Sequence, residues 1–186
     1  MLNKILVTSV ITVGLMMTVS ISPAQANPNA MTWIVLGNPL VLGGKTYVLF
    51  GSDSGTNPYV GDTSINEYRS LLCIKKTNAS APVGLPPPSI TPGGSTRNSW
   101  SGGTVLVIPN IQGKQLTSQS VADKICKQVG KKLTGVLGYR MAEFHDGTGF
   151  YAGWSFWAEA YGGISGLAQS TRYWVYNNDQ PAANPW

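Results

Sequence analysis

A single pair of cysteines, Cys73 and Cys126, limits this chain more than any other feature, because the sequence contains no others. In an oxidising compartment an even pair favours a disulfide, and two buried free thiols are the alternative. A bond between them would close a loop of about 50 residues and, on the chain-entropy account, stabilise the fold by about 4 kcal/mol. A metal site is disfavoured, since the chain has one histidine and no Cys-x-x-Cys spacing. We therefore expect a disulfide, and neither a metal nor a cofactor.

The first 26 residues predict export to such a compartment. Lys4 precedes an apolar run at 5–19, and Pro23 then comes before the small-x-small triplet at 24–26. This is the pattern of a secretory signal peptide, residues 1–26, cleaved after its last residue. An N-terminal membrane anchor is the alternative, but the apolar run is short for a spanning helix. We expect a secreted or periplasmic protein whose mature chain, 27–186, is a single domain without a further transmembrane segment.

Apolar periodicity predicts one clear amphipathic helix at about 119–130. Within it an apolar residue recurs every four positions, and Cys126 widens this apolar stripe. Ser120 is the expected N-cap of the helix, and Gly130 is the expected C-cap. The helix would therefore lay Cys126 against the core, where Cys73 could reach it.

The rest of the chain predicts short strands, so the expected fold class is α+β and strand-dominated. Strand-like apolar or aromatic runs occur at 33–36, 40–42, 46–50, 70–76, 104–109, 139–144, 154–158 and 172–176. Gly43-Gly44, between the second and third runs, predicts a hairpin. Residues 78–103 contain five prolines and five glycines. We expect them to form a surface loop with no regular element.

The charge of the chain is low and mildly positive. Charged residues make up 11% of the sequence, with a formal net charge of +5, against roughly 25% charged residues in ordinary domains. Lys124, Lys127, Lys131 and Lys132 lie on or just after the predicted helix. Four lysines on a short helix indicate a solvated face rather than a nucleic-acid surface. Nucleic acid is therefore not an expected partner.

Aromatic residues gather in the last third of the chain, which holds twelve of the eighteen. The strand at 172–176 would carry rings on both faces, so either both faces are covered or one is an exposed site. Exposed rings beside amide side chains can stack on sugars, whereas most of the rings could equally be core. The candidate ligand-binding residues are Trp154, Trp157, Tyr161, Trp174, Asn177 and Asp179. We expect the tail to be a final strand and a polar turn, with Trp186 packed back on the body.

The segment EFHDG at 143–147 places the one histidine among carboxylates. The favoured interpretation is a turn after a strand, with the histidine hydrogen-bonded within it. No Gly-x-Ser-x-Gly motif accompanies it. The alternative is a secreted hydrolase that uses Glu143, His145, Asp146 or Glu159.

Several of these segments together resemble a recurring aromatic-rich C-terminal module of exported bacterial proteins. They are TVLVIP at 104–109, GYRMAEFHDG at 138–147, GWSFWA at 153–158 and TRYWVYNNDQPAANPW at 171–186. Their order after a cysteine-bearing helix also resembles C-type-lectin-like and endostatin-like domains, which implies a C-type-lectin-like fold. The four-cysteine framework of the lectins is absent. Gln180-Pro181-Ala182 matches the lectins' sugar-selecting triplet only in part, because alanine stands where that triplet has a calcium ligand.

These observations predict an exported, non-enzymatic binding module. Its aromatic C-terminal half would recognise a glycan or another cell-surface ligand. The secreted hydrolase is one alternative. A toxin or adhesin-like protein, whose ring-rich segment meets a host membrane or protein, is another.

Overall fold

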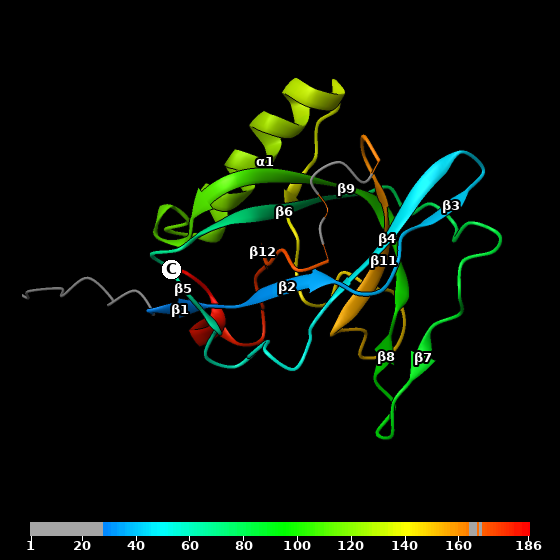
Figure 1. The fold of residues 1–186 in the computed structure, drawn as a ribbon, viewed down its shortest axis with the longest axis horizontal. Coiled ribbons are helices and arrows are strands. Elements are labelled where there is room, and N and C mark those ends of the chain that lie inside the picture. The colour runs from blue at the N-terminus through cyan, green and yellow to red at the C-terminus, as the bar shows by residue number, and fades with distance from the viewer. Residues whose placement is uncertain (1–27, 164–166, 168) are drawn as a thin grey trace, which may run out of the picture.

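A computed structural model of the chain describes residues 28–163, 167 and 169–186. Six of its strands form a closed barrel: β2 Thr32–Val35, β4 Lys45–Gly51, β6 Tyr68–Lys76, β9 Ser99–Gln112, β11 Ser155–Ala160 and β12 Tyr173–Trp174. Their order is β6-β12-β2-β4-β11-β9, and β9 also pairs with β6, which closes the barrel (Figure 1). The predicted signal peptide lies outside the described residues.

Smaller elements surround the barrel. They are β1 Asn29–Ala30, β3 Leu40–Leu42, β5 Thr63–Ser64, β7 Ser89–Ile90, β8 Thr96–Arg97, β10 Arg140–Met141, the helix α1 Gln119–Thr134, and the 3-10 helices η1 Gly113–Gln115 and η2 Pro181–Ala183. Every predicted strand segment overlaps an observed strand, so the strand-dominated α+β class is confirmed. Helix α1 lies on one side of the barrel and the β7–β8 hairpin projects from the other (Figure 1). No helix in the described ranges is long and apolar enough to span a membrane.

The hairpin predicted at Gly43-Gly44 joins β3 to β4. Leu42 pairs with Lys45 across it. The two glycines have φ values of 57° and 76°. A two-residue type I′ turn needs a positive φ at both central positions, which glycine adopts without strain.

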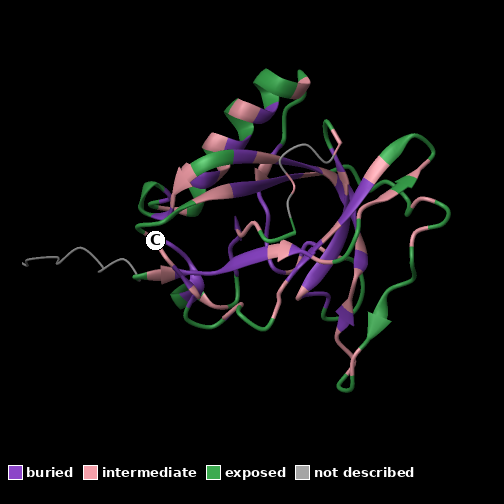
Figure 2. Cartoon of the chain, viewed as in Figure 1, coloured by how far each residue is buried: buried purple, intermediate pink, exposed green. Residues whose placement is uncertain are grey.

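Large rings fill the interior of the barrel. Trp33, Phe50, Phe156 and Tyr173 are all fully buried there, and Figure 2 shows buried residues along the barrel strands. The ring centroids of Trp33 and Phe156 lie 5.5 Å apart, as do those of Phe50 and Tyr173. Rings of this size bury roughly 150–250 Å² each. These four rings therefore make up much of the core inside the barrel.

The outer faces of β6, β9 and β12 form a second core beneath α1. Leu71 of β6, Leu106 of β9 and Trp174 of β12 all point to this side. Their neighbours along each strand point into the barrel instead, as strand alternation requires. Both faces of these strands are therefore covered. Of the two alternatives for the strand at 172–176, the one in which both ring-bearing faces are covered is therefore the one observed.

The predicted disulfide between Cys73 and Cys126 is confirmed. Their Cα atoms lie 5.6 Å apart, and 53 positions of sequence separate them. Cys73 belongs to β6 and Cys126 to α1, and both are fully buried in the second core. The bond therefore ties the helix to the barrel wall.

The N-cap of the helix lies two residues before the expected one. Ser118, and not Ser120, is the N-cap, because its hydroxyl accepts a hydrogen bond from the Val121 N–H at 3.2 Å. A residue that caps a helix must have extended backbone, which Ser118 has. The prediction of Ser120 was therefore wrong.

The prediction of Gly130 as the C-cap was also wrong. The helix continues to Thr134, and Gly135 ends it with a φ of 72°. Gly130 is instead buried against the ring of Tyr139, where a Cβ would lie 2.5 Å from Cδ2. Glycine is needed there because of the close approach of the ring and not because of the backbone conformation.

Residues 78–103 are not the irregular loop that their composition predicts. They include the β7–β8 hairpin and the start of β9. Ser99 pairs in parallel with Phe156 of β11. Gly103 lies so close to β6 that a Cβ would come within 2.6 Å of the Lys75 carbonyl oxygen. The start of β9 pairs with the distant strands β6 and β11, and β7 pairs with β8, so composition alone gave the wrong prediction.

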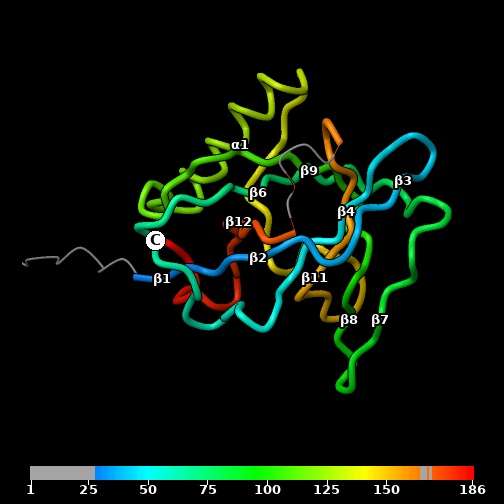
Figure 3. The backbone as a smooth tube through the Cα atoms, viewed as in Figure 1, coloured from blue at the N-terminus to red at the C-terminus, as the bar shows by residue number. Residues whose placement is uncertain are grey.

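The tail is a final strand and a polar turn, as predicted. It returns beside β1 and β2, so the two ends of the described chain lie together (Figure 3). The Asn184 side chain closes the turn, accepting from the Asn177 N–H at 2.8 Å and donating to the Asn177 carbonyl at 3.0 Å. The Trp186 ring packs 6.0 Å from that of Tyr176, between centroids.

Replacing Gly130 with alanine tests the helix–ring contact. In an exposed helix this change stabilises by about 1 kcal/mol. Here the new methyl group would meet Tyr139, so we expect the free energy of unfolding to fall by about 1–3 kcal/mol. Gln128→Ala, at an exposed position of the same helix, is the matched control and should change it by less than about 0.5 kcal/mol. Urea unfolding would contradict the account if Gly130→Ala were as stable as the wild type.

Candidate functional site

A small hollow brings together three segments that are far apart in the sequence. Its volume is about 170 Å³, and we name it the His145 hollow. Its lining residues are Pro58, Tyr59, Phe144, His145, Trp154, Asn177, Asp179 and Gln180. Trp154, Asn177 and Asp179 are three of the predicted ligand-binding residues, and they meet here. Tyr59 and Gln180 were missed, because the only signal at Tyr59 was a lone ring in a polar loop.

The other three predicted residues lie elsewhere. Trp174 is fully buried in the second core, where its Nε1–H donates to the Ile111 carbonyl at 2.9 Å. Trp157 is 6% exposed within the sheet. Tyr161 is 47% exposed, but it lies just beyond β11 and donates its hydroxyl proton to the Leu133 carbonyl at 2.8 Å.

His145 lies in the turn that was predicted for residues 143–147, between two carboxylates. Glu143 accepts the His145 backbone N–H at 2.7 Å, and its other oxygen lies 2.9 Å from Nδ1. Nε2 lies 3.4 Å from an oxygen of Asp179. When Glu143 is ionised it therefore accepts the Nδ1 proton and fixes the ring. The His145 side chain is 34% exposed and that of Asp179 is 65% exposed, so both can reach a ligand.

Asp146 faces away from the hollow and anchors the turn. Its side chain is 2% exposed. It accepts hydrogen bonds from the Glu143 backbone N–H, at 2.7 Å, and from both terminal nitrogens of Arg140. Burial opposes the charge on Arg140, but the hydrogen bond and charge of Asp146 outweigh it and raise the pKa of the guanidinium. Burial also raises the pKa of the neighbouring Tyr176 phenol to about 12, which keeps it neutral.

Glu159 is not part of the hollow. Its carboxylate lies 2.9 Å from the Lys45 ammonium, across the β4–β11 pair. That hydrogen bond raises the pKa of Lys45. Of the residues considered for a hydrolase, only His145 lines the hollow, and Glu143 contacts it from behind through Nδ1. Among the described residues, no group of His, Cys, Asp and Glu side chains is placed to hold a metal ion.

Trp154 lines one wall of the hollow, and its backbone conformation is strained. Its φ is 69°, and the Ser155 N–H donates to the Gly153 carbonyl at 2.8 Å around it. A three-residue turn with positive φ at its centre is the rarer and more strained γ-turn. Such strain costs about 1–3 kcal/mol and is typical of functional sites. The Ser52 N–H, which donates to the Trp154 carbonyl at 2.8 Å, holds the turn in place.

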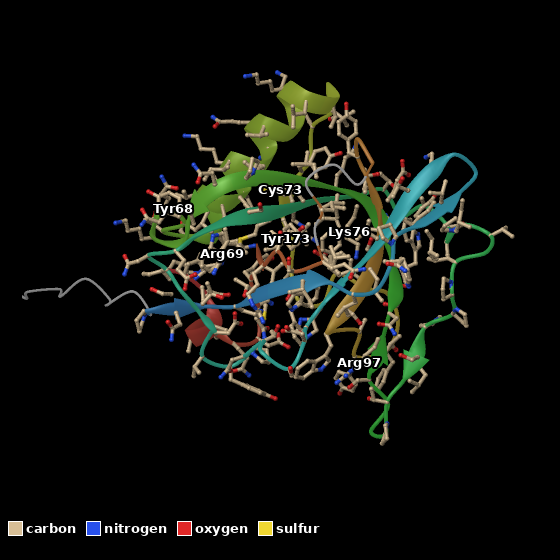
Figure 4. The ribbon with its side chains drawn as sticks, in the orientation of Figure 1. Tyr68, Arg69, Cys73, Lys76, Arg97 and Tyr173 are labelled. Carbon is tan, nitrogen blue, oxygen red and sulfur yellow. A yellow bond between two sulfur atoms is a disulfide. The ribbon has the colours of Figure 1, made fainter. Side chains whose placement is uncertain are left out.

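The indole of Trp154 contacts a cation and a second aromatic ring. The Arg97 guanidinium lies over it, 4.9 Å from the ring centroid, and Figure 4 labels Arg97, which belongs to β8. The centroid of the Phe144 ring lies 5.2 Å from that of Trp154, edge to face, and the His145 ring lies 4.8 Å from Phe144. A cation over an indole and edge-to-face ring pairs are both favourable arrangements. They fix Trp154 relative to His145.

The loop 52–62 forms the opposite wall and carries Tyr59. The side-chain oxygen of Asn57 accepts the Tyr59 N–H at 3.0 Å. Asp62 accepts the Asn57 N–H at 3.1 Å. The side chain of Asn177 donates to the carbonyl of the residue before Tyr59 at 3.1 Å. Asn177 therefore supports the wall, while its amide is used within the protein.

Arg172, just before β12, holds both ends of this loop. One of its nitrogens lies 2.8 and 2.9 Å from the two oxygens of Asp53, and another lies 3.6 Å from Asp62. Burial opposes the charge on Asp53, but hydrogen bonds from Thr56 and Arg172 hold its pKa below the usual value. The loop is thus fastened to the strand that leads into the tail.

Comparison with known proteins gives no relative for this chain. No family model, no curated protein and no solved structure matches it. The candidate site therefore depends on the geometry above. The lectin-like and bacterial-module resemblances stay predictions.

Asn57→Ala tests how the Tyr59 wall is held. The change removes the acceptor of the Tyr59 N–H, so we expect that amide to exchange with solvent about fivefold faster, as for a lost hydrogen bond of about 1 kcal/mol. Asn66→Ala, at an exposed turn position, is the control and should leave the Tyr59 amide unchanged. Hydrogen exchange followed by NMR measures both. Equal Tyr59 rates in the two variants would contradict this account of the wall.

Proposed function

We propose that the protein is an exported, non-enzymatic binding module that recognises a glycan through the His145 hollow. The observation that carries the proposal is the strained turn at Trp154, which holds an indole beside exposed polar side chains. A fold keeps such strain where the surrounding structure imposes it, and functional sites are where it concentrates. The disulfide is compatible with an extracellular or periplasmic location.

The lining of the hollow matches the two-sided chemistry of a sugar. Tyr59 and Trp154 both contribute apolar ring surface to the lining, and a pyranose presents an apolar C–H face. His145, Asp179 and Gln180 can exchange hydrogen bonds with hydroxyl groups. The hollow is smaller than the roughly 300–1,000 Å³ of a drug-sized pocket. One sugar unit of a longer glycan is therefore the ligand that fits, in keeping with the lectin-like resemblance of the segments around it.

A secreted hydrolase is the second candidate, and one observation favours it. Glu143 orients the imidazole of His145, as a carboxylate does for a general base. Against it, both oxygens of Glu143 already accept hydrogen bonds from the turn and from the Asn178 N–H. Neither Asp146 nor Glu159 is placed to supply a second catalytic carboxylate.

Trp154→Ala tests the binding proposal. Loss of a stacking ring should weaken glycan binding by about tenfold or more, as expected when a buried-face aromatic contact is removed. Tyr161→Ala is the matched control, because it removes an exposed aromatic ring outside the hollow and should leave the affinity unchanged. A glycan array identifies a ligand for the wild-type protein, and calorimetry then compares the variants.

Two outcomes would contradict the proposal. The first is an affinity that Tyr161→Ala lowers and Trp154→Ala does not. The second is turnover of a glycan by the wild-type protein that Glu143→Gln abolishes while binding persists. The second result would support the hydrolase, because Gln keeps the shape of Glu143 and removes its charge.

A further inference from the structure

A larger groove lies beside the start of β6, away from the lining of the His145 hollow. Its volume is about 460 Å³, and we name it the β6 groove. Residues 68–70 of β6 form one wall, residues 170–172 form the other, and Asn110 of β9 completes it. Figure 4 shows Tyr68 and Arg69 at this end of β6. The volume falls in the range of roughly 300–1,000 Å³ that is typical of ligand pockets.

A β-bulge shapes the floor of this groove. The register between β6 and β9 shifts so that Pro109 and Asn110 both oppose Ser70. Asn110 takes a φ of 63°, the left-handed region that asparagine tolerates better than most residues. Because β12 begins only at Tyr173, opposite Ser70, residues 170–172 diverge from β6 and leave the groove between them. Bulges often redirect side chains beside binding sites.

The lining is rich in hydrogen-bond donors. It holds two guanidinium groups, three hydroxyl groups of serine and threonine, one amide and one phenol, and no carboxylate lies among the described residues that line it. Arg69 and Arg172 approach from opposite walls. Their ion-pair partners, Glu67 and Asp53, lie outside the lining.

One donor in the groove wall has no acceptor in the described part of the protein. The Nε–H of Arg69 is buried, and no hydrogen-bond partner reaches it. A buried donor without a partner is costly, so the position suits an acceptor brought by a ligand. An arginine is matched in geometry to the oxygens of carboxylate and phosphate groups.

We propose that the β6 groove is a second binding site, for an anionic saccharide. The carboxylate or phosphate of the sugar accepts a hydrogen bond from the Nε–H of Arg69 once this side chain, which is 36% exposed, turns the N–H toward the groove. Its hydroxyl groups meet Ser70, Asn110 and Thr171, and its apolar face lies against the exposed ring of Tyr68. The groove and the His145 hollow share no lining residue, so variants of Arg69 and Asn110 test the groove apart from the hollow.

Titration of the ¹⁵N-labelled protein with three sugars tests the site. The probes are glucuronate, glucose 6-phosphate and neutral glucose, and the readouts are the Arg69 Nε–H resonance and the Ser70 and Asn110 amides. We expect saturable shifts with the anionic sugars and about tenfold weaker binding of glucose. The anion that binds more tightly identifies the charged group. No saturable shift with any probe, or equal affinity for glucose, would overturn the proposal.

Matched variants locate the binding. Arg69→Lys keeps the charge but removes the Nε–H, so it should weaken anionic-sugar binding by about tenfold. Arg97→Lys changes an arginine outside the groove and should have no effect, and neither should Trp154→Ala. Asn110→Gly tolerates the same backbone and removes only the amide, which gives a second test if Arg69→Lys does not fold. Unchanged affinity in Arg69→Lys, or in Asn110→Gly if Arg69→Lys does not fold, would refute the site.

Discussion

The antiparallel pairing of β6 with β9 closes the barrel and places one strand between two cores. Because side chains alternate along β6, Leu72 and Ile74 fill the barrel, while Leu71 and Cys73 face α1. Closure removes the exposed edges that an open sheet of this size would leave. The disulfide then fixes the helix over the outer face of the same strand. The barrel wall is therefore the element on which both cores depend.

The His145 hollow is a consequence of that closure. Its walls come from the loop after β4, the turn after β10 and the tail, which meet only when the barrel is complete. The tail is held on both sides, by β6 and by β2, and Met31 donates to the Ala183 carbonyl at 2.7 Å. Arg172 fastens the Tyr59 loop at the point where the chain enters β12. The barrel strands therefore hold both the tail and the Tyr59 loop in place around the hollow.

The sequence predicted the disulfide from the number of cysteines. It predicted the helix, the strand segments and the Gly43-Gly44 hairpin from local pattern. It failed where a partner outside the local segment decides the structure, as at Gly130, which the Tyr139 ring approaches, and at residues 99–103 of β9, which pair with β6 and β11. The same reason explains the site. Ring content alone does not distinguish the buried Trp174 from the lining Trp154, and the contribution of Tyr59 appears only once the barrel is closed.

The central claim is that barrel closure holds the tail as firmly as the strand beside it. Native-state hydrogen exchange of the Val175 and Tyr176 amides, compared with that of Leu72 in β6, tests it directly. Val175 donates to the Met31 carbonyl and Tyr176 to the Ala142 carbonyl, so these amides should exchange only on global unfolding, at the rate set by the same free energy as Leu72. Fast exchange in the tail while Leu72 stays protected would contradict the account.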